Sequence, residues 1–141
     1  MPSRLHFIRS WMVVAIAVAL LAFGATLTQA KPYWFESYQR AVQLIDADQA
    51  KEGSAILELL LQERPIPVTS LRIPGNQFID YLPYYQQARA QAKLGQLEAA
   101  SENLAVSESH GALTESNRHR KGHSELQQVL NVGDRQALVG S

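Results

Sequence analysis

The chain has 141 residues, in which 13 Lys and Arg balance 13 Asp and Glu, with four His and no Cys. A chain of this length is expected to form one compact domain at most. The lack of Cys excludes disulfide frameworks, thiolate metal sites, cysteine nucleophiles and lipidated cysteine anchors, and the balanced charge argues against a nucleic-acid binder, which needs a concentrated excess of Lys and Arg.

The first 30 residues are typical of a secretory signal peptide. Arg4 and Arg9 precede an apolar run over residues 11–23. Small residues stand one and three positions before the bond between Ala30 and Lys31, as a signal peptidase requires. We therefore expect cleavage after Ala30 and export of the remaining chain, which is then periplasmic or secreted.

The alternative is that the N-terminal segment stays attached as a membrane anchor. Counted as far as Leu27, its apolar stretch approaches the roughly 20 residues that span a bilayer. Because positive charge precedes this stretch, the rest of the chain is expected outside the cytoplasm in either case.

The next segment has the apolar spacing of helices. Four side chains recur at intervals of four, three and four residues: Trp34, Tyr38, Ala41 and Ile45. This spacing places them on one face of a helix. We predict a first helix over residues 33–47, a break at Asp48-Gln49 and a second helix over residues 50–63, which ends before Pro65 because Pro cannot donate to the helical ladder.

Residues 65–83 are predicted to be a loop. Four prolines fix its backbone angles, and Pro74-Gly75-Asn76 is typical of a tight turn. No stretch alternates with period two strongly enough to predict a strand. Phe78 and Tyr81 are too apolar to be left in water, so we expect an ordered loop packed over the start of the next helix, either as a simple connection or with a function of its own.

A second pair of helices is predicted over residues 84–94 and 96–109, with Gly95 in the left-handed conformation between them. An internal repeat relates this pair to the first. Residues 47 positions apart correspond in type: Trp34 and Tyr81, Tyr38 and Tyr85, Ala41 and Ala88, Asp48 and Gly95, Gly53 and Ala100, Leu57 and Leu104. The chain therefore contains two copies of one helix-turn-helix unit.

Small residues indicate where the helices of each unit meet. Ala41 with Gly53, and Ala88 with Ala100, leave room for two backbones to approach. A Gly inside a helix costs about 0.5–1 kcal/mol relative to Ala, so Gly53 predicts close packing at this point. The alternative is that the second helix begins after Gly53.

These residues resemble the tetratricopeptide repeat family. The family has an aromatic residue, a small residue, a turn Gly, an Ala and a Leu at set intervals, which match Tyr84, Ala88, Gly95, Ala100 and Leu104. The first copy matches more loosely, at Ala41, Gly53, Leu57 and Pro65. It also has Asp48 where Gly is usual, the second copy lacks the closing Pro, and the spacing exceeds the family's repeat of about 34 residues.

The resemblance implies an all-α fold in which two helix-turn-helix units, within residues 31–109, form a short α-solenoid. Residues 110–141 are predicted to be a polar tail with one short helix over residues 124–132, which begins at Ser124 and ends at Gly133. Two copies are marginal for stability. We therefore expect the tail helix to cap the exposed edge, or the chain to pair with another copy, or the sequence to be part of a longer array.

The tail does not favour a metal site. His119 and His123 are four residues apart, with His110 nearby, but Arg118 and Lys121 bring repelling charge and no carboxylate completes a coordination shell. A solvated linker over residues 110–123 is favoured instead. No glycine-framed Ser or paired acid supports catalysis, so we expect no enzyme, no metal and no cofactor, and a function that depends on a surface.

The resemblance places that surface on the concave side, which the first helix of each unit lines. The residues expected to point into it are Tyr38, Val42, Asp46, Tyr85, Arg89 and Lys93. Arg89 and Lys93 lie one turn apart and can together receive a carboxylate, while the tyrosines supply rigid contact area. The alternative is that both tyrosines are core residues and both cations belong to a solvated face.

The function favoured by this pattern is that of a non-enzymatic, exported interaction module, which binds a protein or peptide partner on its concave face. The competing hypothesis is a structural or accessory component of an envelope assembly, either membrane-tethered or self-associating. Nucleic acid is not an expected partner.

Overall fold

The computed structural model describes residues 32–140 of the chain. The predicted signal peptide, with its cleavage site between Ala30 and Lys31, lies outside this range. The described part is mostly helical and contains one small two-stranded sheet. None of its helices combines the length and apolar character that a bilayer crossing requires.

The first helical pair consists of α2 (Trp34–Asp46) and α3 (Ala50–Glu63), and α3 has the predicted bounds. Gly53 lies inside α3, where an added Cβ would stand 2.8 Å from the carbonyl oxygen of Ala41 and 2.7 Å from Cγ1 of Ile45. These distances are shorter than real Cβ contacts. The glycine is therefore present because the two helices touch there, and the alternative of a later helix start is wrong.

The second helical pair consists of α4 (Pro83–Lys93) and α5 (Leu97–Ser109). Pro83 occupies the first turn of α4, where its fixed φ suits a helix and its missing N–H removes no bond. The turns of the two pairs both place a residue in the left-handed backbone conformation, but the residue differs. Gly95 has φ +75° and Asp48, at the corresponding position of the first pair, has φ +62°.

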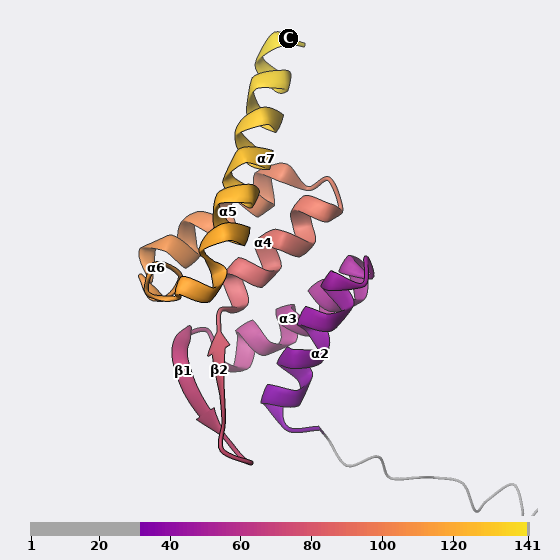
Figure 1. Ribbon diagram of the computed structural model, residues 1–141. Coiled ribbons are helices and arrows are strands. Elements are labelled where there is room, and N and C mark those ends of the chain that lie inside the picture. The colour runs from indigo at the N-terminus through magenta and orange to yellow at the C-terminus, as the bar shows by residue number, and fades with distance from the viewer. Residues whose placement is uncertain (1–31, 141) are drawn as a thin grey trace, which may run out of the picture. The chain divides into compact units, whose positions relative to one another are not determined.

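The two pairs stack through α3 and α4, and each has a core of its own (Figure 1). Ala41, Ile45 and Leu57 are fully buried in the first core, which also takes in Tyr81 and Ala90 from the segment that follows. The second core contains Ala88, Ala100 and Leu104 together with residues of the tail. Side chains that belong to the second unit in sequence thus complete the core of the first.

A β-hairpin replaces the predicted loop, so the prediction of a strand-free segment is wrong. Strands β1 (Val68–Ile73) and β2 (Gln77–Tyr81) pair antiparallel, with Leu71 opposite Ile79, and an irregularity interrupts the register after Val68. Ser70, in that irregularity, has φ +52°. Alternate residues of β1 do face inward, but the interruption and the flanking prolines conceal the period in the sequence.

The tail is more helical than predicted. It contains α6 (Ala112–Glu115), the 3₁₀ turn η1 (Asn117–His119) and α7 (Arg120–Val139). The predicted linker over residues 110–123 is therefore wrong. The helix predicted over residues 124–132 is present but longer at both ends. Helix α7 continues past Gly133. The missing Cβ of Gly133 leaves space for the side chain of Leu97 on α5.

Helix α7 packs on α4 and α5 and extends beyond them at its C-terminal end (Figure 1). Leu126 and Leu130 are buried in the second core. Val129 is half exposed on another side of the helix. The tail thus covers the edge of the second helical pair.

Candidate functional site

A groove runs along the side of the domain where α2, α4 and α7 meet. Its larger part, which we call the α7 lobe, has a volume of about 500 Å³. Its smaller part, the β-hairpin lobe, has a volume of about 340 Å³. The two lobes adjoin each other, because the same four residues line both: Val42, Gln86, Arg118 and His119.

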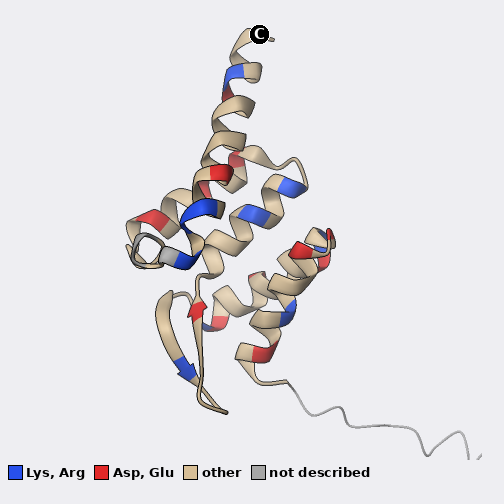
Figure 2. Ribbon diagram, in the orientation of Figure 1, with Lys and Arg blue, Asp and Glu red and all other residues tan. Residues whose placement is uncertain are grey.

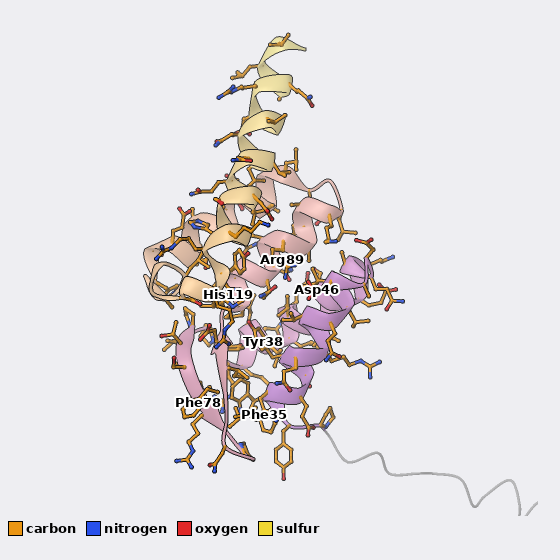
Figure 3. The ribbon with its side chains drawn as sticks, viewed as in Figure 1. Phe35, Tyr38, Asp46, Phe78, Arg89 and His119 are labelled. Carbon is orange, nitrogen blue, oxygen red and sulfur yellow. The ribbon has the colours of Figure 1, made fainter. Side chains whose placement is uncertain are left out.

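Both lobes of the groove have apolar as well as polar side chains in their lining. Phe78 of β2, which is 58% exposed, lies in the β-hairpin lobe, and Val129 of α7 lies in the α7 lobe. Figure 3 shows the order of side chains along this side, from Phe78 through Tyr38 and His119 to Arg89 and Asp46.

All six residues predicted for the concave surface line the groove, but two of them do so differently from the prediction. Tyr38 and Tyr85 are almost fully buried, so they form its floor and offer little ring surface to a partner. The alternative, in which both tyrosines are core residues, is the one that the structure bears out.

Tyr38 links the first helical pair to the β-hairpin. Its hydroxyl donates to the carbonyl oxygen of Asp80 at 3.0 Å and accepts from the N–H of Leu82 at 3.0 Å. Burial raises the pKa of Tyr38 far above its ordinary value, because the ionised ring would lose its hydration. The ring packs edge-on against Tyr81, with centroids 4.9 Å apart, so this part of the groove floor is rigid.

The two predicted cations are already paired within the chain. Arg89 donates to Asp46 at 2.6 Å and to the side-chain oxygen of Gln86 at 2.7 Å. Lys93 donates to Asp48 at 2.5 Å, and this hydrogen bond lowers the pKa of Asp48. Figure 2 shows the basic residues of α4 and the acidic residues at the end of α2 on these neighbouring segments. Both cations thus connect the two helical pairs, and whether they also bind a partner stays a prediction.

Asp80 joins the β-hairpin to the tail. Its carboxylate accepts from the N–H of Ser70 at 3.0 Å and from the hydroxyl of Ser116 at 2.8 Å. His119 and Arg118 approach the same carboxylate at 3.7 and 3.9 Å. Burial alone would raise the pKa of Asp80, but the two hydrogen bonds and the nearby charges outweigh it and hold the pKa below its usual value.

His119 and Arg118 were assigned by sequence to a solvated linker, and the structure places both in the groove. The His119 ring packs edge-on against Tyr85, with centroids 5.6 Å apart. Burial there lowers the pKa of His119. The Arg118 side chain is 68% exposed. One sequence signal for this site was available: Asp80 is an isolated acid between apolar residues, and such a residue requires partners when buried.

The other two histidines of the tail have separate partners. The His123 ring lies 2.6 Å from Glu108, which also accepts from Gln127 at 2.9 Å, so this contact fastens α7 to α5. His110 stacks on Tyr84, with centroids 5.6 Å apart. Within residues 32–140, no three His, Cys, Asp or Glu side chains are grouped as a metal ion requires.

The groove therefore offers apolar side chains and charged groups that a chain segment could contact. Comparison with known proteins adds no assignment to this geometry. No protein-family model matches the chain, and no curated protein or solved structure matches it.

Proposed function

We propose that the chain is a non-enzymatic, exported interaction module, similar to tetratricopeptide repeat proteins, that binds a peptide segment of a protein partner. The observation that carries this proposal is the groove of two adjoining lobes along α2, α4 and α7. Peptide sites in proteins combine apolar pockets with a few placed polar groups, and this groove has both.

The arrangement of the helices supports the proposal. The first helix of each pair, α2 and α4, contributes to the groove, as the family resemblance implies for a short solenoid. Helix α7 adds a third wall of the same kind. The exposed positions of α7 include polar residues, among them Gln128 and Asn131. A polar outer face is what the terminal cap of a helical array needs.

The test is to obstruct the groove without disturbing its walls. Val42 is half buried and borders both lobes, so Val42→Lys places a long charged side chain at their junction. The matched control is Ala55→Lys, which adds the same side chain at an exposed position on α3. Wild-type chain and both variants are crosslinked in intact cells, and the attached proteins are identified by mass spectrometry.

The proposal predicts that Val42→Lys loses a specific crosslinked partner that the wild type and Ala55→Lys retain. Circular dichroism must show the same helix content and unfolding midpoint in the two variants, so that lost binding is not lost folding. Equal capture by all three chains would contradict the proposed groove.

A second candidate function, self-association within an envelope assembly, is favoured by one observation. Helix α7 ends in exposed apolar residues, of which Val132 is 52% and Val139 88% exposed. Light scattering of the purified chain tests this candidate. A dimer that Val132→Glu converts to a monomer supports it, whereas a monomer at all concentrations rejects it. Intact-mass measurement separates the cleaved from the anchored form.

A further inference from the structure

We infer that Arg118 is the residue by which the groove selects its ligand, and that the bound segment carries an acidic side chain between two apolar ones. This inference rests on the proposed function and specifies the class of peptide. It assigns a recognition role to a residue whose surrounding sequence indicates only a solvated linker.

The first argument is the position of Arg118. It borders both lobes, so a segment that fills the groove from end to end must pass it. Val42 lies beside it as an apolar floor residue, while Gln86 is buried and its oxygen is already used by Arg89. Arg118 therefore lies at the centre of the groove.

The second argument is that the contact between Arg118 and Asp80 leaves donors of the guanidinium group available for a ligand. A guanidinium group has five N–H donors in a fixed fork that matches a carboxylate. The contact of Arg118 with Asp80 is 3.9 Å long, beyond hydrogen-bonding distance. Asp80 itself is satisfied by Ser70 and Ser116. The guanidinium can thus turn toward a ligand without leaving a buried acid unpaired.

The third argument is the state of the other charges on the groove. Arg89 and Lys93 are paired with Asp46 and Asp48 at 2.6 and 2.5 Å, so part of their charge is already compensated within the chain. Glu125 has Lys121 at 3.7 Å. Of the cations that line the groove, Arg118 is consequently the one with the weakest internal ion pair.

The fourth argument concerns what lies on either side of Arg118. The β-hairpin lobe offers Phe78 and Ile79, and the α7 lobe offers Ala92 and Val129. Each lobe thus has apolar side chains in its lining, which in the α7 lobe stand beside charged residues. A segment that places an acid at Arg118 would bury an apolar side chain in each lobe, and burial of such groups supplies most of the affinity of peptide sites.

The experiment is selection of random peptides of about 12 residues, displayed on phage, against the full-length chain in mild detergent. Enriched peptides are synthesised, and their affinities are measured by fluorescence polarisation for wild type, Arg118→Gln and Arg118→Glu. The matched control is Arg40→Glu, since Arg40 is an exposed cation of α2 outside both lobes. Arg118→Gln removes the charge without repelling Asp80, which protects the test against a folding defect.

The inference predicts that the enriched peptides share an acidic residue flanked by apolar ones. It also predicts that Arg118→Glu weakens their binding roughly tenfold, because a repulsive contact replaces an attractive one. Arg118→Gln should weaken binding by a smaller factor, and Arg40→Glu should leave it unchanged. A peptide in which Lys replaces the acid should bind the Arg118→Glu variant more tightly than it binds the wild-type chain.

Two failures are distinguishable. If peptides are enriched and Val42→Lys abolishes their binding, but they lack the acid or are insensitive to Arg118, the groove binds peptides and the role of Arg118 is overturned. If no peptide is enriched, or if the enriched peptides bind Val42→Lys as well as wild type, the proposed function is overturned with it.

Discussion

The two helical pairs build the same unit with different residues at its two critical points. At the turn, the first pair uses Asp48 and the second uses Gly95, and both residues take left-handed backbone angles. At the helix crossing, the first pair uses Gly53 beneath the bulky Ile45, and the second uses Ala100. The comparison shows that both units keep a left-handed turn residue and a small residue at the helix crossing. Which residue fills each position depends on its neighbours.

The largest expected effect comes from the matched leucines of the two cores. Leu57 is fully buried and Leu104 is 5% exposed, at corresponding positions of the two units. Leu57→Ala and Leu104→Ala are each expected to lower the free energy of unfolding by about 3 kcal/mol, through lost burial and the cavity left behind. Urea denaturation followed by circular dichroism measures both. A cost near zero at one position would mean that its helical pair is not part of the cooperative fold.

The second-largest expected effect concerns the crossing of the two helices within a pair, where the two units carry different residues. Ala normally stabilises a helix relative to Gly, yet we expect Gly53→Ala to lower the free energy of unfolding by about 1–2 kcal/mol, because the new methyl group overlaps the backbone of Ala41. Ala55→Gly, at an exposed position of α3, is the control for helix propensity alone. If Gly53→Ala were stabilising, the close approach of α2 and α3 would be incorrect.

Substitutions at the two turns should change the free energy of unfolding by less than those at the helix crossing. Gly95→Ala places a Cβ on a left-handed backbone and is expected to lower the free energy of unfolding by about 1 kcal/mol. Asp48→Gly relieves the same strain but removes the ion pair with Lys93, so the two effects oppose each other and the net change should be smaller than at Gly95. Thermal unfolding compares the variants. An equal loss at both turns would show that the ion pair outweighs the backbone strain.

The smallest expected effect is that of pH on the free energy of unfolding. It acts through His119 and Asp80, where the tail contacts the β-hairpin, and not through the apolar cores of the two pairs. The folded pKa of His119 lies below its ordinary 6.5, so the unfolded state binds more protons and stability falls as pH drops below about 6.5. The folded pKa of Asp80 lies below its ordinary 3.8, so its contribution is present above that pH and is lost on further acidification. Urea denaturation across this pH range should show both losses.

Matched variants assign these two losses. His119→Gln should remove the decline that begins near pH 6.5, and Asp80→Asn should remove the one at lower pH. Declines that persist in both variants would place the titrating groups elsewhere in the chain.

The helical pairs could be predicted because their determinants are local. The apolar spacing of α3, the stop at Arg64-Pro65 and the left-handed Gly95 all act within a few residues of one another. The β-hairpin could not be predicted in the same way, since the irregularity near Ser70 interrupts its alternation. Gly133 was misassigned because a glycine that ends a helix and a glycine that admits Leu97 look alike in a sequence.

The candidate site was predictable only as a set of positions. Helical spacing brought Val42, Asp46, Arg89 and Lys93 to one side of the domain, and the structure places all four on the groove. Their pairings join residues more than 40 positions apart, and no local pattern encodes such distances. Arg118 was missed because its place depends on how the tail folds back onto Asp80.

The position of α7 has a consequence for the timing of binding. A ribosome makes the chain from its N-terminus, so α2 and α4 exist well before residues 118–129 have been synthesised. The floor of the groove is therefore synthesised before its third wall and the Arg118 guanidinium. A nascent chain that stops before α7 has no complete groove.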